Sequence, residues 1–335
     1  MKKVSIIIPV YNAESTLNRC LDSVITGTYE NIEIICIDDD SSDWSAKIIK
    51  EYQKKDKRIH YYKNSKNSGP GISKNNGIKK ATGDYLSFVD SDDYIEPDMI
   101  EKMLNFAVKN DLDIVRCNYT NYIDGVPHQA NIPIDTGVFS TAIKDKFIKL
   151  LIEGKVPAYM QLIMIKADFI FKHELTIGDK YYLEDLLYYV RILNLTNRVG
   201  LLNMPLYNYI NNQSGLTFSR DIDRIYKRID GVLYYNKEAK HIIPKEKHAI
   251  DTYTMYLLIL FMYELSQTSD KKIDVIKEIY NRSEVKNIAN NINYDKYNTF
   301  TKVTYKLLKR EHYYLVLCWF RFAKIIIYVK GKFRR

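Results

Sequence analysis

The sequence predicts an α/β protein: a mainly parallel sheet flanked by helices, followed by a mainly helical C-terminal extension. Short apolar segments alternate with helix-like segments over residues 1–120, which is the order of elements in a parallel sheet. These segments are apolar on both faces, so we expect helices on both sides of the sheet. With 335 residues and 46% apolar content, the chain can form one large or two medium-sized domains.

Five strands and four helices are expected in the alternating part. The strands are expected at residues 3–9, 32–38, 59–63, 84–90 and 111–119. The helices between them are expected at residues 14–26, 43–56, 71–81 and 97–109. Beyond about residue 138 the alternation weakens, and helices are expected at residues 140–153, 180–194, 219–238 and 248–267.

The cysteines and the N-terminus favour a protein of a reducing compartment. Four cysteines occur without CxxC spacing, so the sequence predicts neither a disulfide framework nor a zinc site. The first residues, MKKVSIIIPVYNAE, superficially resemble a signal peptide, but Ser5 and Pro9 interrupt the apolar run and no small-residue cleavage site follows. We interpret this segment as a buried first strand.

Two acidic clusters follow strands of the predicted sheet. Asp38, Asp39 and Asp40 follow the second strand, and the sequence DSDD at residues 90–93 follows the fourth. Ligands of α/β sheets collect at the carboxyl ends of the strands, and Mg²⁺ or Mn²⁺ is typically held by one or two carboxylates with phosphate oxygens and water. An Asp-rich turn leading into a helix is the alternative for one such cluster. Two clusters at equivalent strand ends favour a divalent metal with a diphosphate.

Two other nucleotide motifs can be set aside. The sequence GPGISKNNG at residues 69–77 begins like a dinucleotide fingerprint, but Lys74 occupies the position of the third glycine. It also follows the third strand rather than the first, and no Walker motif is present. A nicotinamide enzyme or a P-loop nucleotidase is therefore not expected.

Three segments together resemble the family 2 glycosyltransferases with the GT-A fold, in particular bacterial enzymes that build capsular or cell-surface polysaccharide. They are IIIPVYNAESTLNRCLDSV, IEIICIDDDSSD and GISKNNGIKKATGDYLSFVDSDD, in that order. A weaker similarity continues through YLEDLLYYV at 182–190 and YNYINNQSG at 207–215. The resemblance implies a catalytic domain over residues 1–215, and the pattern of the remaining sequence predicts a helical extension over 216–300 and a basic tail over 301–335.

The resemblance also implies roles for residues at the donor site. Asp39 matches the carboxylate that accepts a hydrogen bond from uracil N3–H, which favours a UDP-sugar. Asp90 and Asp92 match a DxD motif, the first near the ribose and the second on the metal, with Ser91 between them in the same site. The residues that match the nucleoside pocket are Pro9, Val10, Tyr11 and Glu14.

Two positions depart from the family pattern. Lys74 stands where the family usually has an arginine, so it would meet a phosphate as a point charge without a bidentate fork. Asp40 replaces the usual glycine after the paired aspartates, which questions the geometry of that turn.

The implied reaction is direct displacement with inversion at the anomeric carbon, in which a carboxylate accepts the proton of the acceptor hydroxyl. Asp185 matches that base, beside Glu184, although acidic residues at the start of a helix are also stabilised by the helix dipole. Tyr207, Tyr209 and Ser214 either pack in the core or line the acceptor or phosphate side. The usual tryptophan and lysine upstream are not recognisable in AYMQLIMIK.

The C-terminal segment carries the whole net charge of +9, since it contains ten basic residues and a single acidic one, Glu311. The run 312–329 is interrupted by Arg321 and Lys324, so an amphipathic helix at an anionic membrane surface is favoured over a membrane span. A helix packed on the protein core is the alternative. The ten basic residues are 302, 306, 309, 310, 321, 324, 330, 332, 334 and 335.

Taken together, these observations favour an inverting glycosyltransferase at the inner face of a bacterial plasma membrane. It would extend a glycan or a polyprenyl-diphosphate-linked saccharide. A catalytically degenerate, membrane-associated scaffold is the alternative, since Lys74 and Asp40 depart from the family pattern. A nucleic-acid binder is not expected, because residues 1–301 carry no net charge and contain no recognised binding module. The sequence leaves the oligomeric state open, including a homo-oligomer.

Overall fold

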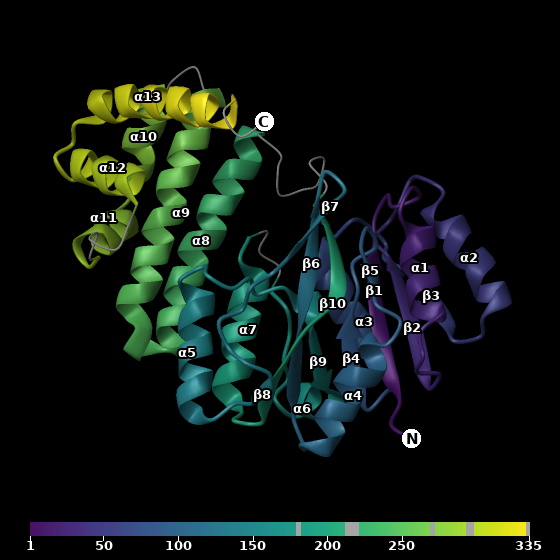
Figure 1. Ribbon diagram of the computed structural model, residues 1–335. Helices are drawn as coiled ribbons and strands as arrows, with labels where there is room; N and C mark the ends of the chain where they lie inside the picture. The colour runs from purple at the N-terminus through teal and green to yellow at the C-terminus, as the bar shows by residue number, and fades with distance from the viewer. Residues whose placement is uncertain (179–181, 212–220, 269–271, 293–297, 333–335) are drawn as a thin grey trace. The chain divides into compact units, whose positions relative to one another are not determined.

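The computed structural model describes residues 1–178, 182–211, 221–268, 272–292 and 298–332, and in the last helix it describes side chains as far as Ala323. The chain forms two compact units. Unit 1 comprises Met1–Ile148, Val156–Lys180 and Glu184–Gly215, and unit 2 comprises Lys149–Lys155, Tyr181–Leu183 and Leu216–Arg335. The expected mainly parallel sheet flanked by helices, with a helical C-terminal part, is confirmed (Figure 1). The division at residues 215 and 300 stays a prediction.

The described part of unit 1 is built on a ten-stranded sheet with the order β3-β2-β1-β4-β9-β6-β10-β5, to which β7 adds beside β6 and β8 beside β10. The pairs along β3-β2-β1-β4 are parallel, and β6 pairs with β10 in parallel. The short strand β9 is antiparallel to both of its neighbours, β4 and β6. The strands are β1 (Val4–Val10), β2 (Ile32–Asp38), β3 (Ile59–Lys63), β4 (Tyr85–Phe88), β5 (Tyr94–Ile95), β6 (Ile114–Ile123), β7 (Val126–Gln129), β8 (Gly137–Val138), β9 (Ile163–Lys166) and β10 (Val199–Asn211).

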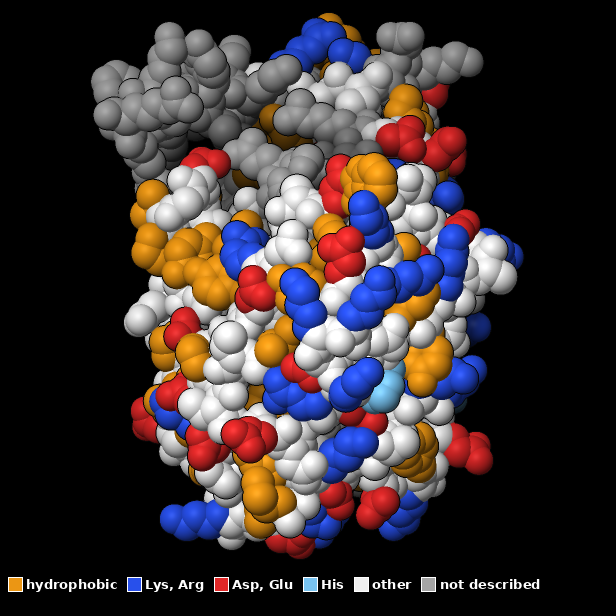
Figure 2. All heavy atoms as spheres, turned by 90° about the vertical axis from the view of Figure 1, so that its right-hand side faces the viewer, with side chains coloured by type: hydrophobic (Ala, Val, Ile, Leu, Met, Phe, Trp, Pro, Cys, Tyr) orange, Lys and Arg blue, Asp and Glu red, His pale blue; other side chains and the backbone are white. Residues whose placement is uncertain are grey.

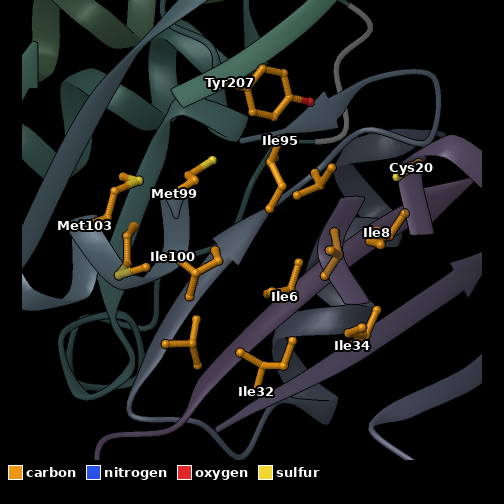
Figure 3. Packing of buried hydrophobic residues seen from close by; sticks show 14 of the residues in the cluster. Ile6, Ile8, Cys20, Ile32, Ile34, Ile95, Met99, Ile100, Met103 and Tyr207 are labelled. Carbon is orange, nitrogen blue, oxygen red and sulfur yellow. The ribbon is translucent and has the colours of Figure 1, made fainter. Parts of the chain in front are cut away.

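Helices cover both faces of this sheet, as the apolar strands predict. Every residue of β1 and β2 is buried. On one face, Ile6 and Ile8 belong to a core formed with α1 and α4, and Tyr207 lies at one side of that core (Figure 3). On the other face, Gly77 of α3 lies against Ile7. The helices of this unit are α1 (Leu17–Ile25), α2 (Ser45–Lys55), α3 (Pro70–Lys80), α4 (Met99–Lys109), α6 (Ala167–Lys172) and α7 (Glu184–Leu195), with the 3₁₀ turn η1 (Met160–Leu162) before β9; α5 (Thr141–Ile152) belongs to it as far as Ile148.

The prediction was incomplete at β8, which precedes α5 in the chain, and at β9 and β10, which follow α5; all three add to the sheet. β9 has only four residues, too few to show a period. β10 has thirteen residues, but its register against β6 shifts on both sides of Pro205, which breaks the alternation of its sequence. Tertiary pairing, rather than local pattern, makes these segments strands.

β3 is the edge strand of the parallel part, and a basic face covers it. Lys and Arg side chains gather over the side of the molecule that carries α2 and β3 (Figure 2). Lys50 lies over the Tyr61 ring of β3 at 5.1 Å, and Lys47 lies over Trp44 at 4.5 Å. Charged side chains at a sheet edge disfavour pairing with a second chain.

Unit 2 is a helical assembly with its own core. Its helices are α8 (Ile222–Ile242), α9 (Lys247–Thr268), α10 (Lys272–Tyr280), α11 (Ser283–Asn290), α12 (Thr299–Lys309) and α13 (Tyr313–Lys332), with the 3₁₀ turn η3 (Pro244–Glu246). A buried network joins α8 to α9: the Asn236 amide donates to Asp251 at 2.8 Å and to Thr254 at 3.0 Å, and Lys240 pairs with Asp251. Because all partners are satisfied, this polar network does not weaken the core.

The predicted helix over residues 312–329 is present as α13. One face of α13 joins the core of unit 2 through Val316 and Phe320, both fully buried. The opposite face exposes Tyr314, Leu315 and Phe322. Within the described residues, no helix has the length and apolar character needed to cross a membrane.

Candidate functional site

The loops after β1 and β2 brace each other at the carboxyl edge of the sheet. The Asn12 carboxamide oxygen accepts from the Ser42 N–H at 2.9 Å, and the Ala13 N–H donates to the Ser45 hydroxyl at 2.9 Å. The Glu14 carboxylate accepts from the Trp44 N–H at 2.9 Å, at the start of α2. Pro9 and Val10 are buried within β1, whereas Tyr11 is 48% exposed just beyond it. Of these four residues predicted at the nucleoside pocket, Glu14 therefore also stabilises a helix start.

The three aspartates after β2 have three different surroundings. The Asp38 carboxylate is buried and accepts from the Ser41 N–H and the Tyr61 hydroxyl, both at 2.9 Å. The Asp40 carboxylate pairs with Lys63 at 2.9 Å on the surface. Asp40 has a φ of 64°, the left-handed conformation that a glycine would adopt. Asp tolerates this conformation better than most residues, so the turn is kept without the glycine.

Asp39 is almost fully buried and holds the loop that leads into α3. Its carboxylate accepts from the Asn64 amide and the Gly69 N–H at 2.7 Å each, and from the Ser68 N–H at 3.0 and 3.1 Å. The Ser68 N–H is shared between the two oxygens, so three N–H donors are spread over the four acceptor positions of the carboxylate. A nucleobase N–H is a donor of the same kind.

The DSDD loop divides into one anchor and two outward carboxylates. Asp93 is buried and accepts from the Tyr207 hydroxyl and the Ile210 N–H, both at 2.7 Å. Helix α1 and the residue before it hold the backbone of the loop, because Thr16 donates to the Ser91 carbonyl at 2.9 Å and Arg19 to the Asp92 carbonyl at 2.6 Å. Asp90 and Asp92 remain partly exposed beside this anchor.

Lys74 lies among the candidate carboxylates. It is 4% exposed on α3, and its Nζ lies 3.4 Å from Asp90 Oδ1. Burial lowers the pKa of Lys74, but Asp90, Asp185 and Glu184 raise it by more, so its net pKa lies above the usual value. The ammonium therefore stays charged and offsets part of the repulsion between the carboxylates.

Asp185 and Glu184 begin α7 and approach α3. Burial raises the pKa of Asp185 above its ordinary value, Lys74 and a hydrogen bond from the Met160 N–H lower it, and Asp90 raises it. The Glu184 carboxylate lies against Gly71, where a Cβ would come within 3.3 Å of both of its oxygens. The Asn75 side chain and the Ile177 backbone exchange two hydrogen bonds, at 2.8 and 2.9 Å, which ties the segment before α7 to α3.

The structure thus brings together Lys74, Asp90, Asp92, Glu184 and Asp185, which lie as much as 111 positions apart in the chain. Of the tyrosines predicted near this site, Tyr207 packs in the core and anchors Asp93, and Tyr209 is partly exposed. Ser214 lies outside the described residues. Sequence reasoning missed Asn64, Asn75 and Tyr159, and it did not single out Asp93 as an anchor. No local signal separates Asp93 from its neighbours, because its partners lie on β10.

Within the described residues, no group of three or more His, Cys, Asp or Glu side chains forms a metal cage. The Asp93 carboxylate accepts two hydrogen bonds from β10, so the oxygens of Asp90 and Asp92 are the ones in this loop that could bind a metal. Burial and the neighbouring Asp90 raise the pKa of Asp92, and Arg19 and Lys74 offset only part of that rise. Two carboxylates suit Mg²⁺ or Mn²⁺ completed by phosphate oxygens and water.

Comparisons with known proteins identify relatives of this chain. The family described as glycosyl transferase family 2 matches residues 5–160. EpsH of Bacillus subtilis (strain 168), named as a glycosyltransferase, is 31% identical over 255 residues, which cover 75% of this chain and 71% of EpsH. The crystal structure of S. aureus TarS 1-349 in complex with UDP-GlcNAc superposes with a TM-score of 0.68 at 16% identity, covering 96% of this chain and 91% of that one.

A second structure, the mannosyltransferase PcManGT from Pyrobaculum calidifontis in complex with GDP-Man and Mn²⁺, has a TM-score of 0.55 at 13% identity. It covers 97% of this chain and 86% of that one. At such low identity, both structures show a shared fold and nothing further.

Proposed function

Because this chain belongs to glycosyl transferase family 2, we propose that it moves a sugar, with inversion, from a UDP-sugar to a hydroxyl of a growing, lipid-linked surface polysaccharide. The chain is a glycosyltransferase; the donor, the acceptor and the stereochemistry are the proposed part. The observation that carries the proposal is the convergence of Lys74, the Asp90–Asp92 pair and the Glu184–Asp185 pair at one edge of the sheet.

The donor end is supported by Asp39 and by the fold relatives. Uracil presents an N3–H donor to a carboxylate that already organises the loop around it. TarS, which has the same fold, was crystallised with UDP-GlcNAc, and PcManGT was crystallised with GDP-Man and Mn²⁺. A nucleotide diphosphate reaching from Asp39 toward Asp90 and Asp92 would follow the carboxyl ends of β2, β1 and β4.

Asp90 and Asp92 would hold the divalent metal, which supplies positive charge for the leaving diphosphate. Lys74 adds a second positive charge to this position, and its burial strengthens the electrostatic effect. Asp185 would accept the proton of the attacking hydroxyl. Its raised pKa makes it a stronger base than an exposed aspartate, while the Met160 N–H fixes its orientation.

The resemblance to enzymes that build surface polysaccharide supports the proposed acceptor, and the basic tail supports the proposed location at a membrane. An enzyme that extends a lipid-linked saccharide gains by staying at the membrane surface. The exposed apolar face of α13, with Arg321 beside it, has the composition of an interfacial helix. We therefore assign the protein to the inner face of the bacterial plasma membrane.

The test is calorimetric titration of the full chain with UDP, with and without Mn²⁺. We expect binding that depends on Mn²⁺ in the wild type and falls at least about tenfold in Asp92→Asn, since a charged ligand group is lost. The matched control is Asp111→Asn, an exposed aspartate before the amino end of β6, which should bind as the wild type does. Binding by Asp92→Asn at wild-type strength would contradict the assignment.

The base of the nucleotide is tested with a second variant. Asp39→Asn replaces a hydrogen-bond acceptor by a group that can donate. The variant should therefore lose more affinity for UDP, whose N3 carries a proton, than for CDP, whose N3 accepts a hydrogen bond. An equal loss of both nucleotides would mean that Asp39 acts only on the loop at Asn64–Gly69. UDP binding without any hydrolysis of UDP-sugars would instead favour an inactive scaffold.

A further inference from the structure

A strip of aromatic and amide side chains runs along β6 and β10. Side chains two positions apart in a strand lie on the same face, so Tyr119 and Asn121 share a face of β6, and Tyr209 and Asn211 share a face of β10. Tyr209 and Asn121 are direct partners in the parallel register, which places both pairs on one side of the sheet. We call these four residues, with Tyr159, the aromatic–amide strip.

The three tyrosine rings of the strip contact one another. Tyr159 stacks on Tyr209 with ring centroids 5.2 Å apart and an interplanar angle of 15°, and Tyr119 meets their edges at 5.7 and 6.4 Å. All three are partly exposed. In the described part of the chain, none of the three hydroxyls has a hydrogen-bond partner, although buried tyrosines usually have one. The rings thus form an aromatic surface with free polar ends.

The amides of the strip carry unmet hydrogen-bond acceptors. The carboxamide oxygens of Asn121 and Asn211 are buried, and each lacks a hydrogen-bond donor in the described structure. A buried acceptor without a donor is destabilising, so such groups are usually satisfied by water or by a ligand. Two of them on one face, beside aromatic rings, point to a ligand that offers hydroxyl groups.

The strip adjoins both the DSDD loop and the predicted base. The Ile210 N–H, between Tyr209 and Asn211, donates to Asp93 at 2.7 Å. Tyr159 directly precedes Met160, whose N–H bonds to Asp185. Burial is the main cause of the raised pKa of Tyr159 and Tyr209; Asp93 adds to both, Asp185 to that of Tyr159, and Asp90 and Asp92 to that of Tyr209. A ligand on the strip would therefore lie beside the reacting groups.

We propose that the aromatic–amide strip binds the saccharide of the acceptor; this rests on the proposed transferase function. The C–H-rich face of a pyranose ring packs on the tyrosines, and its hydroxyls donate to Asn121 and Asn211. The nucleotide is not the occupant, because Asp39 follows β2 and the strip lies on β6 and β10, with β1, β4 and β9 between them in the sheet. The strip thus orients one acceptor hydroxyl toward Asp185.

The proposal is tested by saturation-transfer NMR of the full chain with methyl glycosides of glucose, galactose and N-acetylglucosamine, in the presence of UDP and Mn²⁺. We expect signals from ring C–H protons in the wild type. Tyr159→Ala and Tyr209→Ala should each weaken saccharide binding by about ten- to thirtyfold, the usual loss for a central aromatic contact. Tyr159→Phe should retain it, and Tyr62→Ala on β3 is the matched control.

Asn121→Leu separates binding from folding. Replacing an unsatisfied buried amide by an apolar side chain is expected to leave the midpoint of urea unfolding unchanged or raise it, while saccharide binding falls. Saccharide binding at wild-type strength in both alanine variants, or no signal from any glycoside in the wild type, would overturn the strip.

UDP titration of the same samples distinguishes this failure from failure of the proposed function. If UDP binds but no glycoside signal appears, only the role of the strip is contradicted. If glycoside signals depend on the tyrosines but UDP does not bind, only the proposed donor is contradicted.

Discussion

Neighbouring carboxylates of this protein differ in function because their surroundings differ. Asp90, Asp92 and Asp93 are nearly consecutive, yet Asp93 is consumed by two hydrogen bonds from β10, while Asp90 faces Lys74. The same division holds after β2, where Asp38 and Asp39 are buried acceptors and Asp40 is a surface residue in a left-handed turn. Burial and donors, not the residue type, decide which carboxylates remain for a ligand.

The coupling of Lys74 to Asp185 makes a prediction about pH. Asp185 must be ionised to act as a base, so the rate rises with pH through its pKa, which burial has raised. Lys74→Met removes the charge that lowers this pKa, and the pKa of Asp185 should rise further. The acid limb of kcat/KM for UDP-sugar hydrolysis should therefore move to higher pH.

The control for this shift is Lys79→Met, an exposed lysine of the same helix. In this variant the rate and the pH of the acid limb should both match those of the wild type. An acid limb that stays in place in Lys74→Met, or moves to lower pH, would show that the titrating group is not Asp185.

At the scale of elements, helix α3 connects the sheet to the site. Its residue Gly77 touches β1, its Lys74 reaches Asp90, and its Asn75 holds the segment at Ile177. A small displacement of α3 from the sheet would therefore move the charged residues of the site together. The close approach depends on the absence of a side chain at position 77.

Gly77→Ala should separate α3 from β1. A Cβ at this position would lie 2.4 Å from Ile7 Cγ2, so the helix must shift, and we expect a loss of about 1–3 kcal/mol in the free energy of unfolding by urea. Gly137→Ala is the matched control, since nothing lies within 4 Å of the position that a Cβ would take there. Adding Ile7→Ala to Gly77→Ala removes the clash, so the losses in the free energy of unfolding should not add. Additive losses would argue against this contact.

The sequence predicts the parallel part of the fold well, and the reason is physical. β1 and β2 are buried throughout, so most of their residues are apolar, and this pattern is visible without the structure. β9 and β10 become strands through pairing with distant partners, and the shifts around Pro205 hide their period. The sequence questions the turn geometry at Asp40, where the family has a glycine, and the structure shows that Asp40 itself adopts the left-handed φ of a glycine.

At the scale of the whole molecule, the candidate site joins segments that are far apart in the sequence. The sequence alone presents Asp90 and Asp185 as separate acidic motifs, and only the motif order of a family relates them. In the structure they interact through Lys74. The aromatic–amide strip was less predictable still, because it combines two strands and the residue before η1. Such sites depend on tertiary pairing that no local period reports.

The exposed face of α13 gives the last prediction. Tyr314, Leu315 and Phe322 are 66%, 49% and 53% exposed, whereas Val316 and Phe320 hold the helix in the core of unit 2. Replacing the three exposed residues by serine should leave the urea midpoint unchanged and lower partition to phosphatidylglycerol vesicles. Losing about 1 kcal/mol of apolar burial at each position corresponds to roughly a hundredfold in partition.

Co-sedimentation with these vesicles measures the effect. The matched control replaces Val108 and Phe171 by serine, since these are apolar side chains of similar exposure, 50% and 52%, on unit 1. Binding of the wild type should weaken with salt, because basic residues such as Arg321 meet the anionic headgroups. If the triple serine variant sediments as the wild type does, the exposed face of α13 does not contact the membrane.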